Sequence, residues 1–246
     1  MKRLKVKTRT VCLALALVFS YLAVTFFVEN LDTYVPTIND LGKSSDFYVV
    51  LDAGHGGMDG GCSTEDGVPE KGINLEILKM VRDMCKAYGY NVDVTRDTDT
   101  SIHDNGIEGI ANQKKSDMDN RLEIFNKHPN AICISIHQNN FTDPKYSGAQ
   151  MFYSSANPDS EGLARIMQEK FVSNIQPENK RETKLCGKEL FLCYFCENPT
   201  VMIECGFLSN PEEAEKLKNP EYQKQVAFTI FSGINEYMNS KYAKQN

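Results

Sequence analysis

Short apolar runs recur along most of the chain and are bounded by turn-forming residues. Residues 47–51 and 131–136 are rich in β-branched and aromatic side chains, a pattern typical of buried strands. Residues 91–96, 148–153 and 200–203 predict three further strands in the same way.

Apolar residues at helical spacing mark the segments between these strands. Residues 71–88 predict an amphipathic helix that ends at Gly89, residues 116–127 predict a second, and residues 163–175 predict a third. The alternation of strands and helices indicates an α/β fold with a mostly parallel central sheet.

The C-terminal part contains two helix starts. Asn210-Pro211 and Asn219-Pro220 each supply an N-cap followed by proline at the first helical position. The first start implies that residues 204–209 are the end of a strand followed by a tight connection.

The N-terminal 28 residues have the pattern of an export segment. Residues 11–28 are uncharged and apolar, and five basic residues precede them. The pattern allows a cleaved signal peptide or a retained membrane anchor. Residues 29–46 are polar and predict a tether, so that residues 47–246 form a single catalytic domain.

The charge beyond the export segment argues against one class of partner. Without residues 1–28, the chain has 22 Lys and Arg residues against 33 Asp and Glu residues, a formal charge of −11. A nucleic-acid partner is therefore excluded, because phosphate binding requires clustered basic side chains.

Seven cysteines follow the export segment, and an odd number cannot all pair within one chain. We therefore expect no disulfide framework. Cys85 and Cys133 occupy apolar positions and are expected to be buried thiols. Cys193 and Cys196 form a C-x-x-C pair, but no second pair or nearby histidine completes a metal knuckle.

Four side chains carry the candidate chemistry. His55, His137 and Glu204 lie at or just after predicted strand ends, where the crevice of an open α/β sheet is found. Glu70 lies at the start of the helix 71–88. Two imidazoles and a carboxylate suit a catalytic Zn²⁺, which needs three protein ligands, and leave one carboxylate for proton transfer.

The residues around these positions resemble a known family. Residues 51–57 (LDAGHGG), 70–75 (EKGINL), 135–139 (SIHQN) and 203–210 (IECGFLSN) are similar to the four motifs of the zinc-dependent N-acetylmuramoyl-L-alanine amidases of the Amidase_3 type. The motifs occur in the family's order, and the resemblance extends from about residue 47 to the C-terminus.

The resemblance implies a twisted sheet of about six strands with helices on both faces. It also implies one zinc ion per chain, bound by His55, Glu70 and His137, with Glu204 as the catalytic carboxylate. The substrate would be peptidoglycan, cut at the amide bond between N-acetylmuramic acid and L-alanine.

Further motif positions imply supporting roles. Arg96, with Asp99, and Arg121 match positions that would hold the metal ligands in place. Gln138 departs from the small residue that often follows the third-motif histidine. Asn139 and Asn140 are candidates for hydrogen bonds to the glycan or the peptide.

A single amidase domain behind an export segment resembles the spore-cortex branch of the family, which removes stem peptides so that muramic lactam can be made. The resemblance implies a location outside the cytoplasmic membrane, facing the cell wall or spore cortex, and allows an accessory protein there.

Three alternatives use the same residues. Cys205 with His137 as base would make a cysteine peptidase, and a structural zinc would make a non-catalytic wall-binding module. A zinc endopeptidase would differ only in the bond it breaks. His103 and His128 follow no predicted strand, and we expect them to be surface or core residues outside the site.

Overall fold

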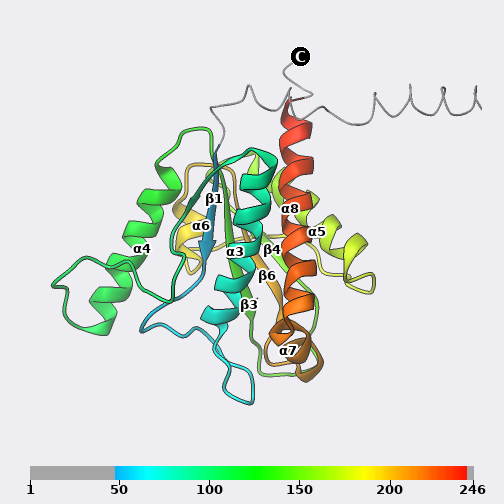
Figure 1. Cartoon of the computed structure of the whole chain (residues 1–246), viewed down its shortest axis with the longest axis horizontal. Helices are drawn as coiled ribbons and strands as arrows, with labels where there is room; N and C mark the ends of the chain where they lie inside the picture. Colours follow the sequence, from blue (N-terminus) through cyan, green and yellow to red (C-terminus); the bar gives the residue numbers. More distant parts are fainter. Residues whose placement is uncertain (1–47, 243–246) are drawn as a thin grey trace, which may run out of the picture. The chain divides into compact units, whose positions relative to one another are not determined.

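A six-stranded sheet runs through the part of the chain that the computed structural model describes, residues 48–242 (Figure 1). The strand order is β2-β1-β3-β6-β4-β5, and only the β4–β6 pair is antiparallel. The strands are β1 (Tyr48–Ala53), β2 (Asn91–Val94), β3 (Ile132–Asn139), β4 (Gln150–Tyr153), β5 (Lys184–Leu185) and β6 (Thr200–Phe207). The expected mixed, mostly parallel α/β sheet of six strands is thus confirmed.

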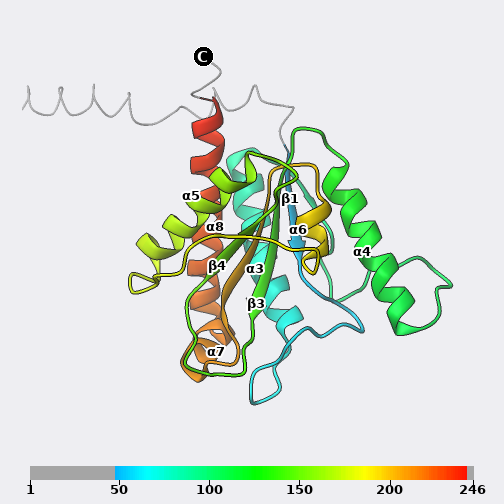
Figure 2. The ribbon, with the colours of Figure 1, turned by 180° about the vertical axis from the view of Figure 1, so that it is seen from behind.

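Helices cover both faces of this sheet (Figures 1 and 2). One face carries α3 (Glu70–Tyr88), α5 (Ser160–Asn174) and α8 (Pro220–Tyr242), which pack against one another. The other face carries α4 (Ile110–Asn126) and the short α6 (Phe191–Phe195), which are in contact. The remaining helix, α7 (Pro211–Lys218), follows β6 directly.

The two faces of the sheet differ in chemistry because side chains alternate along each strand. In β1, Val49, Leu51 and Ala53 belong to the main hydrophobic core under α3, α5 and α8. Between them, Val50 packs with Phe125 of α4 in a second, smaller core. The α4 side of the sheet is therefore the side on which polar residues of the central strands are found.

Several element boundaries differ from the sequence prediction. Strand β3 continues through His137 to Asn139, beyond the predicted run 131–136. Strand β6 continues through Glu204 to Phe207, whereas the apolar run that predicted it stops at Ile203. The apolar run ends there, but the ladder continues, because Glu204 pairs with His137 and Phe207 with Asn139 across a register shift in β3. Helix α4 begins at Ile110, six residues before the predicted start, because the polar run 112–117 that follows Ile110 and Ala111 carries no helical apolar pattern.

Other boundaries follow the sequence. The side chain of Asn210 accepts a hydrogen bond from the backbone N–H of Glu213 at 3.0 Å, as expected of the N-cap of α7. Strand β5 and helix α6 were not predicted from the sequence.

The export segment, residues 1–28, and the tether, residues 29–46, lie outside the described residues. Within residues 48–242, no helix has both the length and the apolar character that crossing a membrane requires.

Candidate metal centre

Two adjacent strands place a histidine and a glutamate opposite each other. His137 in β3 and Glu204 in β6 are register partners in a parallel pair. His137 alternates with Ile134 and Ile136, and Glu204 lies between Ile203 and Cys205, all of which face the main core. The two polar side chains therefore emerge on the same face of the sheet, the one that carries α4 and α6.

His55 reaches this face from the turn that follows β1. Its backbone is left-handed, with φ 64°, and no other non-glycine residue of the described chain has a positive φ. Two arginines hold the turn by binding its carbonyl groups. Arg96 donates to the carbonyls of Ala53 and Gly54, and Arg121 donates to those of Ala53 and His55, at 2.7 to 3.0 Å.

Glu70 is the first residue of α3, and its carboxylate is almost fully buried. It accepts hydrogen bonds from the backbone N–H groups of Cys62 and Gln138 and from the side chain of Asn74, at 3.0 to 3.1 Å. Asn74 lies one turn further along α3 and also donates to the Gly54 carbonyl. These contacts fix the carboxylate between the two histidines.

His55, Glu70 and His137 converge closely enough to bind one metal ion. One ligand atom from each lies within 4.8 Å of the others, and within residues 48–242 no other group of three metal-ligating side chains does so. Nε2 of His55 is 3.3 Å and Nδ1 of His137 is 2.9 Å from the two oxygens of Glu70. Two neutral imidazole nitrogens and one carboxylate oxygen are a donor set that suits a catalytic zinc.

Two glycines leave the space that this cluster occupies. A Cβ atom on Gly54 would lie 2.1 Å from Cε1 of His137, and one on Gly61 would lie 2.5 Å from the Glu70 carboxylate. Gly61 also has a positive φ of 70°. The glycine-rich segment after β1 thus permits close approach to the ligand side chains, and the described residues give no support to a phosphate-binding loop there.

The electrostatics of the three side chains are strongly coupled. Burial favours the neutral form of the His55 imidazole, but the hydrogen bonds to Glu70 and Asp59 outweigh it and raise the His55 pKa to about 9. Burial alone would raise the pKa of Glu70, yet the contacts with His137 and His55 hold it well below its usual range. A carboxylate facing two imidazoles is an arrangement that a cation would stabilise.

Glu204 lies beside this group but is not part of it. Its Oε2 atom is buried and has no hydrogen-bond partner among the described residues. Burial raises the Glu204 pKa to about 7 and Glu70 adds to the rise, while the two histidines oppose it. A buried carboxyl group with a free oxygen and a pKa near neutrality is suited to accept and return a proton.

A cavity of about 320 Å³ opens onto these groups. Its lining includes His55, His137, Glu204 and residues 189–192, which form the start of α6 and the two residues before it. The site therefore has room for a substrate beside both the candidate ligands and the candidate proton carrier.

Arg121 also forms buried ion pairs beside the candidate site. Its guanidinium is fully buried and pairs with Asp52 of β1 and, at 2.7 Å, with Asp117 of α4. Burial would raise the pKa of Asp52, but Arg121 keeps it below its usual value. Ser135 of β3 donates to the same carboxylate at 2.7 Å. This network ties β1, β3 and α4 together directly below the metal centre.

Sequence reasoning assigned no role to Asp52 or Asp59. Asp52 is an acidic residue inside an apolar strand, and such a residue needs a buried partner, which is the signal that would have revealed it. Asp59 accepts from Nδ1 of His55 at 2.9 Å and is itself bound by Lys114 of α4 at 2.9 Å. No local sequence signal identifies Asp59, because its partners are fixed only by the fold.

Asn139 and Asn140 lie apart from the cavity at the metal centre. The Asn139 side chain accepts a hydrogen bond from the Asn140 backbone N–H at 2.8 Å. Asn140 lines a neighbouring hollow of about 570 Å³, together with Phe141 and Ser209. Any contact of these amides with substrate would thus occur beyond the C-terminal ends of β3 and β6.

The alternative thiol nucleophile is not brought to the site. Cys205 is fully buried in the main core, on the opposite face of β6 from Glu204. Burial raises the pKa of its thiol far above the usual value, which removes the reactive thiolate. His137 therefore has no cysteine partner of the kind that a cysteine peptidase requires.

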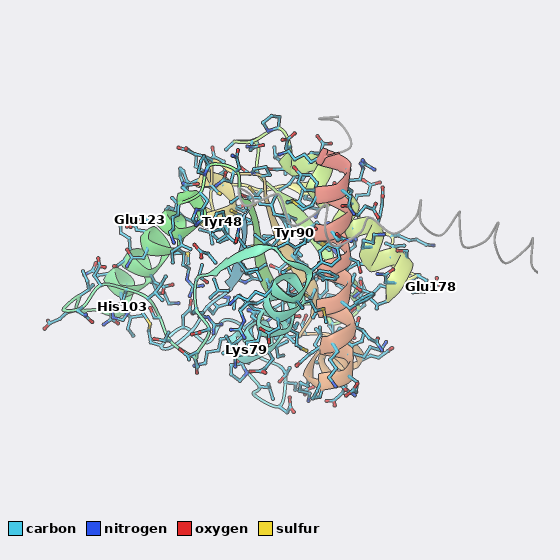
Figure 3. All side chains as sticks on the ribbon, turned by 45° about the horizontal axis from the view of Figure 1, so that its top comes forward. Tyr48, Lys79, Tyr90, His103, Glu123 and Glu178 are labelled. Carbon is cyan, nitrogen blue, oxygen red and sulfur yellow. The ribbon has the colours of Figure 1, made fainter. Side chains whose placement is uncertain are left out.

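The other two histidines are held by local contacts, as expected. His103 bonds to Ser101 at 2.9 Å and lies beside α4 (Figure 3). His128 stacks on Tyr48 with ring centroids 3.5 Å apart and bonds to Asp93 at 2.8 Å. Neither belongs to the group that could bind a metal.

Known proteins of one family share this fold and sequence. The family model described as N-acetylmuramoyl-L-alanine amidase matches residues 49–236. The germination-specific N-acetylmuramoyl-L-alanine amidase of Bacillus subtilis is 35% identical over 193 residues, which cover 78% of this chain and 80% of that protein. The amidase AmiA of Escherichia coli is 26% identical over 231 residues, covering 77% of this chain and 75% of that protein.

A solved structure agrees with these sequence matches. The CwlD amidase from Clostridioides difficile, in complex with the GerS lipoprotein, is 35% identical and superposes with a TM-score of 0.75 over 78% of this chain and 98% of that one. Together with the match to the family model over most of the described residues, this similarity decides the classification. The chain belongs to the N-acetylmuramoyl-L-alanine amidase family.

Proposed function

We propose that this chain hydrolyses the amide bond between N-acetylmuramic acid and L-alanine in peptidoglycan with one zinc ion, bound by His55, Glu70 and His137. The observation that carries the proposal is the donor set, two imidazoles and a carboxylate within 4.8 Å of one another, with Glu204 left over beside it. A structural zinc in a non-catalytic module would instead favour a closed, cysteine-rich set of four ligands.

In this mechanism, the chain's own residues position the substrate and carry the proton. The lactyl carbonyl would bind in the cavity that His55, His137 and Glu204 line. When bound, zinc polarises the carbonyl oxygen and lowers the pKa of water towards about 7. Oε2 of Glu204 accepts the proton of the attacking water and then returns it to the nitrogen of L-alanine, so that the peptide leaves as an amine.

Two arginines support the ligands without touching the substrate. Arg96 and Arg121 bind the carbonyl groups of the turn that carries His55 and thereby set the direction of its ring. Asp59, bonded to Nδ1, leaves Nε2 of His55 free for the metal. Residues that orient ligand side chains in this way typically change metal affinity by roughly 10- to 100-fold when they are removed.

Product analysis tests the reaction. Purified peptidoglycan is digested with the full chain, and both products are identified by mass spectrometry. We expect glycan strands without stem peptides and free peptides with a new N-terminal L-alanine. Peptides that are cut internally while the muramyl bond stays intact would show that the chain is an endopeptidase and not an amidase.

We propose further that the substrate is spore-cortex peptidoglycan and that the enzyme acts outside the cytoplasmic membrane. The support is the similarity to a germination-specific amidase and to an amidase solved together with a lipoprotein. The second similarity also supports an accessory protein at the membrane or wall as a partner of this chain. Deletion of the gene tests the role: spores should lack muramic lactam, and an unchanged cortex would refute it.

A further inference from the structure

Four buried cysteines at or near α6, all free thiols in this structure, form two pairs. In the sequence, Cys193 and Cys196 form a C-x-x-C pair, but in the fold they belong to different clusters. Cys193 packs with Cys186 and Met202, whereas Cys196 packs with Cys133 in the small core below α4. The local pair is thus divided, and each member has a distant cysteine as its neighbour.

The first pair is fixed by adjacent carbonyl groups of β4. The backbone N–H of Cys186 donates to the carbonyl of Tyr153 at 2.9 Å, and the thiol of Cys193 donates to the carbonyl of Phe152 at 3.6 Å. Two consecutive residues of β4 thus contact the two cysteines, which also belong to one buried cluster. A hydrogen bond between the two thiols lowers the pKa of Cys186.

The second pair is fixed by the C-terminal end of α4. The thiol of Cys133 donates to the carbonyl of Phe125, and that of Cys196 to the side-chain oxygen of Asn126, both at 3.4 Å. Again two consecutive residues hold both thiols. The hydrogen bond between them lowers the pKa of Cys196, the thiol nearer to reacting as a thiolate.

We propose that Cys186–Cys193 and Cys133–Cys196 are two disulfide sites that are oxidised where the family acts, outside the cytoplasm. In each, a bond forms between the two Sγ atoms as both thiols lose their protons. The two electrons pass to an external disulfide, either a small molecule or a disulfide oxidoreductase, which is reduced to two thiols. Oxidising compartments are where such bonds persist.

The four thiols do not form one metal site instead. The two pairs lie in separate clusters, and within residues 48–242 the only group of three convergent ligands is the one at His55, Glu70 and His137. Pairwise contact without a third ligand favours cross-linking over metal binding.

The bonds would fix one wall of the active-site cavity. Residues 189–192 line the cavity together with Glu204, and they lie between Cys186 and Cys193 in the sequence. The first bond closes this segment into a loop, and the second attaches the end of α6 to β3. Both restrict the unfolded chain and so stabilise the folded wall.

Peptide mapping of the full chain, after incubation with oxidised glutathione, tests the proposal. The eight thiols of the reduced protein, counted after unfolding, should fall to four, and digestion without reductant should release the two linked peptide pairs. Retention of all eight thiols, or a Cys193–Cys196 link, would overturn it. Both readouts are independent of hydrolytic activity, so they stand apart from the proposed reaction.

Variants provide the matched control. Cys186→Ser should abolish only the link to Cys193, and Cys196→Ser only the link to Cys133. Cys85→Ser, in a buried thiol on α3 outside both clusters that hold the pairs, should leave both links and the loss of four thiols unchanged. Reduction should lower the thermal unfolding temperature of the oxidised wild type. An unchanged temperature would contradict the stabilising role of the two disulfides.

Discussion

Glu70 and Glu204 both have buried carboxyl oxygens, yet their surroundings give them opposite properties. Glu70 is surrounded by donors, including two backbone N–H groups, and stays ionised. Glu204 has an unpartnered oxygen and a pKa raised to about 7. At the scale of single residues, the number of hydrogen-bond donors thus distinguishes the proposed metal ligand from the proposed proton carrier.

Substitution of Glu70 and substitution of Glu204 should therefore have different effects on zinc occupancy and turnover. Glu70→Ala should lower zinc occupancy and activity together, since a catalytic zinc has only three protein ligands. Glu204→Gln should keep zinc but lower turnover by about 10²- to 10⁴-fold, because the amide cannot accept the proton. That loss is equivalent to roughly 3 to 5 kcal/mol of transition-state stabilisation.

Zinc content and peptidoglycan turnover of both purified variants are the measurements. Loss of metal from Glu204→Gln with retention in Glu70→Ala would mean that the roles are exchanged. Unchanged turnover in both variants would place the active site elsewhere.

The pKa of Glu204 also predicts a pH-dependent stability in metal-free protein. Because folding raises this pKa from 4.5 to about 7, the native state binds more protons than the unfolded state between these values. The contribution of Glu204 to stability is therefore complete below pH 4.5 and is lost as the pH rises towards 7. Glu204→Gln removes this dependence and should be more stable than the wild type by about 3 kcal/mol above pH 7.

Urea unfolding of both proteins in the presence of a chelator, from pH 4.5 to pH 8, measures the difference. A constant difference across this range would show that Glu204 titrates at its ordinary pKa in the folded state.

At the scale of elements, the turn after β1 brings three parts of the fold together. Gly54 lies against the His137 ring of β3, and the carbonyl of Gly54 accepts from Asn74 of α3 and from Arg96. A side chain at position 54 would therefore change how β1 packs against β3 and α3.

Gly54→Ala should disrupt the metal site, because its Cβ would lie 2.1 Å from the His137 ring. We expect zinc affinity to fall by at least about 10- to 100-fold, the range found when ligand orientation is disturbed. Gly72→Ala is the matched control, since its Cβ would meet no atom within 4 Å and the residue lies inside α3. It should keep zinc and gain roughly 0.5 to 1 kcal/mol of stability.

Zinc titration of the two alanine variants provides the comparison. Equal affinity in both would mean that the His137 ring can move aside, and that close packing at Gly54 does not determine ligand placement.

Elements with a strong local pattern could be predicted from the sequence. The apolar runs of β1, β3 and β6 and the N-cap at Asn210 located these strands and the start of α7. The ends of β3 and β6 were missed because the ladder, not hydrophobicity, extends the two strands past His137 and Glu204. The two-residue β5 and the five-residue α6 are too short to show a period.

The candidate site could be predicted from the sequence only where its residues lie in local motifs. His55, Glu70, His137 and Glu204 occupy motif positions, and the fold brings them together. Asp59, bound by Lys114, and the network around Asp52 depend on contacts between residues far apart in the sequence. Such contacts leave no periodic signal in a single chain.

At the scale of the whole molecule, the six-stranded sheet, its helices and the candidate metal centre all lie within residues 48–242. The proposed division into an export segment, a tether and a catalytic domain can therefore be tested by truncation.

A chain that begins at Ser44 should fold and bind one zinc ion with the affinity of the full-length protein. Circular dichroism, zinc analysis and peptidoglycan digestion measure this expectation. An insoluble or metal-free product would show that residues 29–43 contribute to the core, contrary to the proposed tether.

The left-handed backbone at His55 has a consequence for how the family can change over time. A side chain in this conformation costs roughly 1 kcal/mol relative to glycine, and only the requirement for a ligand at this point justifies it. In a descendant that no longer needed hydrolysis, selection for stability would favour glycine at position 55. After a loss of catalysis, His55, with its left-handed backbone, should therefore be the first residue of the site to be replaced. The buried network around Arg121 should persist, because it holds β1, β3 and α4 together.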